Sequence, residues 1–427
     1  MAGGLQVKLG KILKRNGVYD MDATQWEQSR EWIREELFSY CLPFWLHHGW
    51  DRENGGVYTC LDREGQLYST DKSVWMQGRC GYIFAALCQQ YGVREEWLAF
   101  SKSCVDFLEG HCIDPGTGRL YFTVTGTGEP LRIRRYFFSE AFYILANAAY
   151  YRVSGDPAAL ARARRYYALL YDWNHGRVAD PVGLPPKTIP ATRRERALAP
   201  AMIYLNVSQV MRECDGENTA LYTQRAQECA QEILTYHFKP ECGCTLENVG
   251  LDGAYENRYS AGRIVNPGHD MECSWFLMRE ALYQQDMELF SKARQMFDMA
   301  FEKGWDTEYG GILYFVDAEN RPPESYEHDM KLWWPHNEAL IASLLLYKQT
   351  GEEAYGQTFS RVLDYCRRVF SDRIYGEWYG YLRRDGKPTM PPSKGTTFKG
   401  PFHLPRMLSM CDSMLTELLQ GRDGAAL

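Results

Sequence analysis

The sequence lacks any long apolar run, which argues against a membrane protein. No uninterrupted apolar stretch in the 427 residues approaches the roughly 18 residues that a membrane-spanning helix needs. The early basic residues Lys8, Lys11, Lys14 and Arg15 lead into no apolar segment, so we expect neither a secretory signal nor a membrane anchor. We therefore expect a soluble chain in the cytoplasm.

Basic charge is not in excess either. The chain has 48 Lys and Arg against 55 Asp and Glu, a formal net charge of −7 that is spread along the sequence. Nucleic acids and anionic membrane surfaces select basic patches, so we expect neither of them as a partner.

The 13 cysteines are odd in number and do not form a disulfide framework. The one tight pair, Cys242 and Cys244, has no second pair at zinc-finger spacing. We expect reduced, mostly buried thiols, in agreement with a cytoplasmic location.

The common signatures of cofactor and metal enzymes are missing. No Gly-x-Gly-x-x-Gly follows a strand, no Gly-x-Ser-x-Gly elbow occurs, and the His-Glu-x-x-His zinc motif is absent. The segment 393–397 resembles part of a phosphate loop but lacks the upstream glycine and strand. We therefore predict no metal and no required cofactor.

Aromatic residues, in contrast, are abundant, with 12 Trp and 29 Tyr. Sugar C–H faces pack on aromatic rings, so this surplus fits a carbohydrate site, and it fits equally a core built from large side chains.

A repeat of about 64 residues is the strongest pattern in the chain. Residues 49–58 recur as 304–313, and weaker copies begin at Asp114 and Asp372. The aspartates of these copies are separated by 63, 192 and 66 residues, which places two further copies near residues 178 and 242. The motif Asp-x-x-x-Gly-Gly before alternating apolar residues predicts a turn that opens a short hairpin.

Between the turns, apolar residues recur at helical spacing over 26–47, 74–91, 95–110, 140–153, 157–170 and 218–236. Asp156 before Pro157 is typical of a capped helix start. Two helices and a hairpin fill one repeat, so six repeats predict an all-α (α/α)6 barrel, with an open solenoid as the alternative. The barrel is expected over 21–420, with an N-terminal extension at 1–20 and a tail at 421–427.

Polar residues recur at a similar distance after each turn, where the chain enters the next helix. In a closed barrel these equivalent positions meet at one mouth. We therefore predict a central site that contains Arg79, Glu140, His269, Glu272, His336, Glu338, His403 and Arg406.

Three of the nine histidines fall at this mouth. Imidazoles titrate near neutral pH and serve as acid and base, so we predict that His269 and His403 form a catalytic pair. Glu272 follows His269 at i+3 on one helix face, and we expect it to orient that imidazole; the same spacing also occurs in metal-binding pairs. His336 follows two tryptophans and a proline, and a structural hydrogen-bonding role suits it equally.

These blocks resemble the N-acylglucosamine 2-epimerase family, also known as renin-binding proteins, over residues 25–420. The resemblance is carried by 55–79, 138–140, Asn266-Pro267-Gly268-His269 with Glu272, 331–338 and 399–406. It implies an (α/α)6 barrel that interconverts N-acetyl-D-glucosamine and N-acetyl-D-mannosamine, in amino-sugar and sialic acid metabolism. It also implies a homodimer and ATP as an activator that is not consumed, without assigning residues to ATP.

The same superfamily holds cellobiose 2-epimerases and aldose–ketose isomerases, which share the arginine and the two histidines. Those relatives carry a histidine at the head of the fourth inner helix, where this chain reads Leu-Ala-Pro-Ala-Met-Ile over 198–203. The departure favours the acylamino-sugar branch, whose members have an apolar Pro-Met stretch there, and it makes Met202 a predicted substrate contact.

Inversion at C2 of an aldose requires loss of the proton beside the C1 aldehyde and its return from the opposite face. We assign His269 and His403 to the two faces and Arg79 to the developing enediolate oxygen. The other predicted substrate contacts are Glu140, Trp75, Trp334, His336, Glu338, Arg406 and Met202.

Other functions fit the same residues. An aldose–ketose isomerase would return the proton to C1, and the substrate of an epimerase could be another sugar, such as mannose, glucose or cellobiose. An inverting glycosidase would use two of Glu140, Glu272 and Glu338. A non-catalytic sugar- or protein-binding module has little need for two histidines at the mouth.

Overall fold

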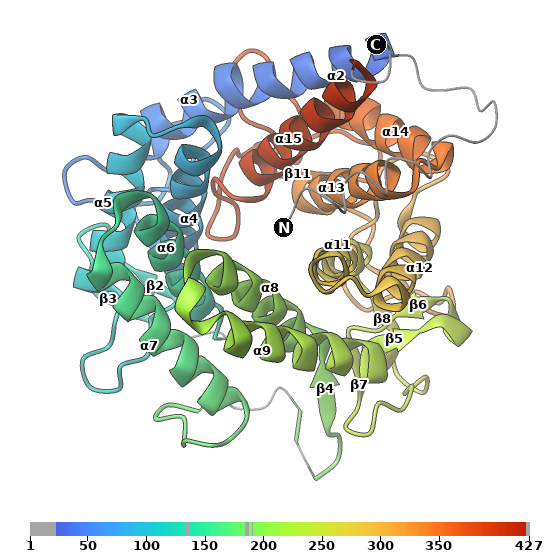
Figure 1. Cartoon of the computed structure of the whole chain (residues 1–427), viewed down its shortest axis with the longest axis horizontal. Helices are drawn as coiled ribbons and strands as arrows, with labels where there is room; N and C mark the ends of the chain where they lie inside the picture. Colours follow the sequence, from blue (N-terminus) through green and yellow to red (C-terminus); the bar gives the residue numbers. More distant parts are fainter. Residues whose placement is uncertain (1–22, 134–136, 184–187, 190, 424–427) are drawn as a thin grey trace.

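Helices dominate the computed structural model, which describes residues 23–423 apart from 134–136, 184–187 and 190 (Figure 1). The first helical run is continuous and consists of α2 (Ala23–Glu35), a π-helical turn (Glu36–Cys41), α3 (Leu42–Phe44) and a second π-helical turn (Trp45–Gly49). The other long helices are α4 (Val74–Tyr91), α5 (Glu95–His111), α6 (Phe138–Ser154), α7 (Pro157–Asn174), α8 (Leu198–Cys214), α9 (Thr219–Glu232, extended by a π-helical turn, Ile233–His237), α11 (Pro267–Gln284), α12 (Met287–Gly304), α13 (Trp333–Thr350), α14 (Glu353–Val369) and α15 (His403–Asp423).

These helices confirm the six that the periodicity predicts, and α4 has the predicted bounds. The Asp156 side chain accepts a hydrogen bond from the Ala158 N–H at the start of α7, as its capping pattern predicts. The predicted N-terminal extension (1–20) and the last residues of the predicted tail lie outside the described residues. Helix α15 continues past the predicted boundary at residue 420.

The long helices form two concentric rings (Figure 1). The inner ring consists of α4, α6, α8, α11, α13 and α15, and the outer ring consists of the run that begins with α2 together with α5, α7, α9, α12 and α14. Inner helices are buried nearly all round: every residue of α13 from Trp333 to Tyr347 is buried, whereas α14 buries one stripe. The predicted (α/α)6 barrel is therefore confirmed.

The ring closes where the first outer helix meets the last inner helix. Arg30 and Arg34 of α2 form ion pairs with Asp412 of α15 at 3.1 and 2.7 Å. The Tyr91 hydroxyl at the end of α4 donates to the same carboxylate at 2.8 Å. Because the terminal repeats cover each other, the open-solenoid alternative is wrong.

Five repeat turns have one construction, and the copy predicted near residue 178 shows no such pairing among the described residues. Residues pair across them as Trp50 with Val57, Ile113 with Leu120, Trp305 with Ile312 and Ser371 with Trp378, and β5 (Phe238–Lys239) pairs with β6 (Cys244–Thr245). In the copy at 304–313, Gly310 and Gly311 have φ of 74° and 76°, a conformation that favours glycine. The ammonium of Lys331 binds the turn's Asp306 at 2.8 Å and ties the hairpin to the next inner helix.

Short antiparallel strand pairs join neighbouring repeats. These are β1 (Lys72–Ser73), β2 (Thr123–Val124) and β3 (Pro130–Arg132); β4 (Glu195–Ala197) with β7 (Asn248–Gly250); β8 (Ile264–Val265) with β9 (Val316–Asp317); and β10 (Lys331–Leu332) with β11 (Tyr381–Leu382). Strands β1, β4 and β10 lead directly into inner helices, and β8 does so after one residue. The strand pairs therefore bring inner-helix N-termini, which carry partial positive charge, to one face of the barrel. Among the described helices, none is long and apolar enough to cross a membrane.

Candidate active site

The first two turns of four inner helices supply the predicted catalytic residues. Helix α4 carries Arg79, α11 carries His269 and Glu272, α13 carries Trp334 and Glu338, and α15 carries His403 and Arg406. The ring of Trp334 lies 5.1 Å from that of His269 and 5.7 Å from that of His403. The predicted pair of histidines, 134 positions apart, therefore borders a single indole.

A glycine makes room for this indole. A Cβ atom on Gly268 would lie 2.6 Å from the Trp334 ring, so any other residue at this position would displace the ring. Gly268 directly precedes His269, and the Asn266 side chain caps the helix by accepting the His269 backbone N–H at 3.2 Å. The Asn-Pro-Gly-His block thus sets both the start of α11 and the approach of Trp334.

His403 is buried and is held by a carboxylate. Its Nδ1 donates to Glu338 Oε1 at 2.8 Å, and Glu338 Oε2 accepts the indole N–H of Trp275, also at 2.8 Å. Because the carboxylate only accepts, Nδ1 carries the proton and Nε2 is left as the basic nitrogen. Burial lowers the pKa of His403 well below its usual value, and the nearby guanidinium groups of Arg79 and Arg406 lower it further.

His269 has the same type of hydrogen bond and the opposite pKa shift. Its Nδ1 lies 2.7 Å from Glu247 Oε1, and 28% of its side chain is exposed. Burial acts to lower the pKa of His269, but the charge and hydrogen bond of Glu247, helped by the charges of Glu272 and Glu338, outweigh it and raise the pKa.

The prediction that Glu272 orients His269 is therefore wrong, because Glu247 makes that hydrogen bond. Glu247 lies 22 positions earlier in the sequence, between β6 and β7. Its backbone is held on both sides: its C=O accepts the Leu198 N–H at 2.9 Å, and its N–H donates to Ile264 at 3.2 Å. Sequence reasoning missed Glu247, since no local spacing links it to the histidine.

Glu272 binds Arg406 instead. The Arg406 Nη2 group donates to Glu272 at 2.6 Å and to Glu338 at 2.8 Å, and it lies 3.3 Å from His403 Nδ1. Ligand atoms of Glu272, Glu338 and His403 lie within 4.8 Å of one another, a grouping that could hold a metal ion. The Arg406 guanidinium provides one positive charge beside the two carboxylates of this group.

Arg79 forms no hydrogen bond or ion pair with any residue that the structure describes. Its guanidinium carbon lies 4.3 Å from the ring centre of Phe142 and 4.8 Å from that of Phe402. Burial lowers the pKa of Arg79 to about 9, which still leaves the group protonated at neutral pH. The N–H donors of Arg79 are thus available to a substrate.

Two predicted substrate contacts are held by hydrogen bonds to other residues. His336 donates from Nδ1 to Leu332 O at 2.7 Å and accepts the Ile312 N–H at Nε2 at 2.9 Å. Burial lowers its pKa to about 3. Glu140 accepts the Arg119 guanidinium at 2.7 Å and the N–H of Leu120 at 3.1 Å.

Ile312 and Leu120 hold the same position in their repeat turns. The geometry therefore shows that His336 and Glu140 hold a repeat turn against the following inner helix. Their predicted contacts to a substrate stay predictions. Equivalent distances after the turns did not place these two side chains beside the histidines, because neighbouring positions of one helix point in different directions.

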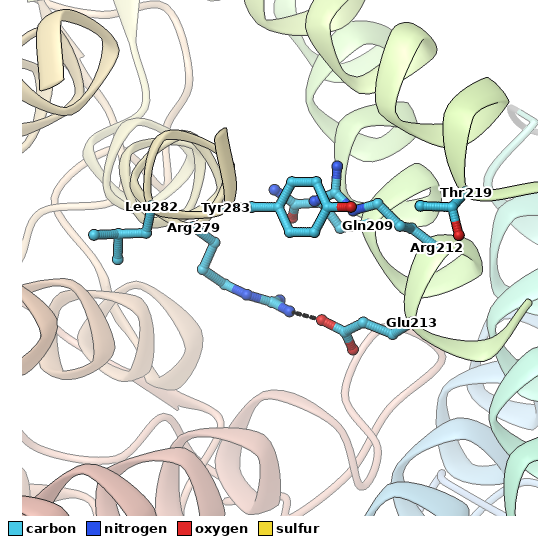
Figure 2. A pocket seen from close by; sticks show the side chains of 7 residues that line it. All are labelled: Gln209, Arg212, Glu213, Thr219, Arg279, Leu282 and Tyr283. Atoms are coloured by element: carbon cyan, nitrogen blue, oxygen red, sulfur yellow. Dashed lines mark hydrogen bonds and ion pairs between the residues drawn. The ribbon is translucent and has the colours of Figure 1, made fainter. Parts of the chain in front are cut away.

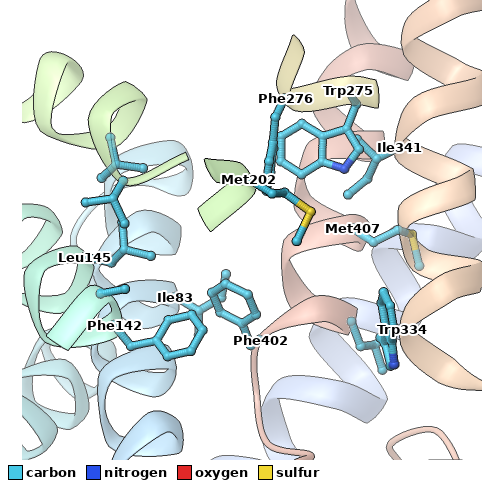
Figure 3. Packing of buried hydrophobic residues seen from close by; sticks show 14 of the residues in the cluster. Ile83, Phe142, Leu145, Met202, Trp275, Phe276, Trp334, Ile341, Phe402 and Met407 are labelled. Carbon is cyan, nitrogen blue, oxygen red and sulfur yellow. The ribbon is translucent and has the colours of Figure 1, made fainter. Parts of the chain in front are cut away.

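Trp75 and Met202 are largely buried, at 8% and 5% exposure. Trp75 packs among aromatic rings, with Phe122 and Phe138 at 5.2 and 5.3 Å. Figure 3 shows Met202 projecting from α8 toward the interior of the inner ring, where Phe402 and Trp334 also lie. Their contacts to a sugar stay predictions.

A described pocket lies away from these residues (Figure 2). It has a volume of about 440 Å³ and lies between the C-terminal parts of α8 and α11, where Arg279 forms an ion pair with Glu213. Arg279 follows His269 by ten residues on α11, which is roughly 15 Å along the helix axis. This pocket is therefore at the opposite mouth of the barrel from the histidines.

Comparisons with known proteins show the family and the fold of the chain. The model of the family "N-acylglucosamine 2-epimerase (GlcNAc 2-epimerase)" matches residues 56–399. The N-acylglucosamine 2-epimerase of Bos taurus is 39% identical over 382 residues (88% of this chain, 89% of the bovine protein), and that of Rattus norvegicus is 37% identical over 402 residues (92% and 93%). The structure of cellobiose 2-epimerase from Spirochaeta thermophila has the same fold, with a TM-score of 0.79 at 21% identity, over 93% of this chain and 98% of that one.

Proposed function

The chain belongs to the N-acylglucosamine 2-epimerase family, and from this premise we propose that it interconverts N-acetyl-D-glucosamine and N-acetyl-D-mannosamine. The observation that carries the proposal is the pair of imidazoles beside Trp334, each tied through Nδ1 to a carboxylate and each shifted in pKa in the opposite direction. One acid and one base, present together near neutral pH, are what an inversion at carbon requires.

The reaction begins with the open-chain sugar. The neutral imidazole, His403, removes the C2 proton; the C–H electron pair forms the C1–C2 double bond, and the C1 carbonyl oxygen becomes an enolate oxygen, since C2 of this substrate carries the acetamido nitrogen. The protonated imidazole, His269, then returns a proton to C2 from the opposite face, and the carbonyl re-forms. In the reverse direction the two histidines exchange roles.

Negative charge on the enolate oxygen is stabilised by Arg79, the one cation of the site whose donors are not bound to carboxylates in the described part of the chain. The positive N-terminal ends of the inner helices add to this stabilisation. Glu247 and Glu338 hold the two imidazoles in the orientation that presents Nε2 to the substrate.

The substrate assignment rests on the family and on Met202. An apolar side chain at the head of α8 suits the methyl group of an N-acetyl substituent, whereas a histidine there would favour hydroxyl groups. As the family resemblance implies, we extend the proposal to a cytoplasmic homodimer that acts in amino-sugar and sialic acid metabolism and that ATP activates without being consumed.

The test is an incubation with N-acetylglucosamine in D2O, with and without ATP, followed by NMR. We expect N-acetylmannosamine with deuterium at C2. Parallel incubations with mannose and with a glycoside test the alternatives: a ketose formed from mannose without turnover of N-acetylglucosamine would reassign the chain as an aldose–ketose isomerase, and hydrolysis of the glycoside without C2 deuteration would make it a glycosidase. Binding without turnover would make it a sugar-binding protein.

A further inference from the structure

Arg79 is partly buried and, among the described residues, differs from the more deeply buried arginines in having no carboxylate partner. Arg212 pairs with Glu280 at 2.8 Å, Arg263 with Asp317 at 2.9 Å, and Arg406 with two glutamates. Buried charges are normally matched in this way, because an unpaired charge is costly to remove from water. Within the part of the chain that the structure describes, aromatic rings take the place of the carboxylate for Arg79.

Two phenylalanines from different elements supply these rings. Phe142 lies in α6 and Phe402 directly precedes α15, and they are 2% and 3% exposed. Their ring centres are 5.8 Å apart at an interplanar angle of 70°, so the two rings flank the guanidinium from different directions. Figure 3 shows both rings on the interior side of the inner ring.

Phe402 also contacts a second guanidinium. The carbon of the Arg406 guanidinium lies 4.6 Å from the centre of the Phe402 ring, close to the 4.8 Å of Arg79. The ring therefore contacts both the free cation and the cation that is bound to Glu272 and Glu338. Phe402 is also the immediate neighbour of His403, so a shift of this ring would reach both groups.

A glycine allows the other ring to approach. A Cβ atom on Gly78, the neighbour of Arg79, would lie 2.6 Å from Phe142 Cβ and 2.7 Å from its backbone. Only a residue without a side chain lets α6 come this close to α4. The Gly-Arg dipeptide of α4 is thus matched to Phe142.

We propose that Phe142 and Phe402 are positioning residues that hold Arg79 through the face of its guanidinium and leave its N–H donors free for the enolate oxygen. The inference rests on the proposed function. A carboxylate partner would occupy these donors, whereas a ring attracts the cation without using them. The positive charge stabilises the anionic enolate much more than the neutral sugar, so the rings should act on kcat more than on KM.

Substitution of each ring by an aliphatic side chain tests the inference. We expect Phe402→Leu and Phe142→Leu to lower kcat for epimerisation roughly 10- to 30-fold with little change in KM, and Phe402→Tyr to restore most of it. The matched control is Phe84→Leu: Phe84 is fully buried in α4 and packs on Phe100 at 4.7 Å without contacting a cation. Phe84→Leu should lower the melting temperature as much as Phe402→Leu does and keep native kcat.

Chemical rescue separates the positioning role from a loss of packing. In Arg79→Ala, added methylguanidinium should restore part of the turnover by occupying the space between the rings. In the double variant Arg79→Ala with Phe402→Leu, the same concentration should restore at least tenfold less. Equal rescue in both variants would overturn the inference, as would native kcat in Phe402→Leu or in Arg79→Ala. A wild type that is inactive on N-acetylglucosamine would instead overturn the proposed function.

Discussion

The surroundings of His269 and His403 differ more than their hydrogen bonds do. Both imidazoles donate from Nδ1 to a glutamate, at 2.7 and 2.8 Å, yet the pKa of His269 is raised and that of His403 is lowered. Burial lowers the pKa of both imidazoles; the charges of Arg79 and Arg406 lower that of His403 further, whereas the charge and hydrogen bond of Glu247 outweigh burial at His269. The two glutamates also differ in what else they bind. Glu338 also binds the Arg406 guanidinium, whereas Glu247 forms no ion pair with a lysine or arginine among the described residues.

A carboxylate partner by itself therefore does not set the pKa of an imidazole. A lone carboxylate stabilises the imidazolium, while a carboxylate that a guanidinium has neutralised orients the ring without favouring its charge. The site thus obtains an acid and a base from two residues of one type, at the N-termini of two helices of one kind.

The largest effect should come from removing either imidazole. We expect His269→Ala and His403→Ala each to lose about 10²- to 10⁴-fold in epimerisation, because one of the two proton transfers then has no acid or base. Circular dichroism should show an intact barrel. Each variant should still exchange the C2 proton of one epimer with D2O and not of the other, the epimer differing between the two variants; exchange of both epimers by one variant would refute the two-histidine assignment.

Removal of the positive charge of Arg406 should bring the pKa values of the two histidines closer together. In Arg406→Met the charges of Glu272 and Glu338 are no longer matched, so the pKa of His403 should rise and the acid limb of kcat/KM should move to higher pH by about one unit. The free energy of unfolding should fall by about 3 kcal/mol, since two buried carboxylates lose their partner. Thermal and urea unfolding together with a pH–rate profile measure both effects; an unmoved acid limb would contradict the explanation.

The wild-type pH profile should be bell-shaped around the ordinary imidazole pKa. Activity falls at low pH as His403, with its lowered pKa, becomes protonated, and at high pH as His269, with its raised pKa, loses its proton. Glu247→Gln removes the charge that raises the pKa of His269, so the alkaline limb should move to lower pH by about one unit while the acid limb stays. A profile in which the acid limb moves instead would exchange the roles of the two histidines.

The smallest effect on catalysis should come from His336, which lies outside this comparison. His336→Ala removes the acceptor of the Ile312 N–H and should cost about 1–3 kcal/mol in the free energy of unfolding. We expect kcat to stay native, because the residue serves the repeat turn. A large loss of kcat in a folded variant would return His336 to the substrate site.

More of the fold than of the candidate site could be predicted from the sequence. The period of 64 residues, the turns and the bounds of α4 follow from interactions within one repeat, and these patterns are visible in a single chain. The partner predicted for His269 rested on the same short-range spacing and was wrong. Glu272 binds Arg406 of α15, while Glu247, which precedes β7 and β8 in the chain, binds the imidazole.

The sequence by itself therefore determined the helices, the number of helix-pair repeats and the position of the two histidines at one mouth of the barrel. Turn chemistry and apolar spacing act over a few tens of residues, so a single chain shows them. The tertiary structure alone decided which carboxylate each histidine binds, which guanidinium neutralises which carboxylate, and which rings hold Arg79. The physical reason is that these groups meet only when the ring closes, and the direction in which each side chain points depends on the packing of helices that are distant in the chain.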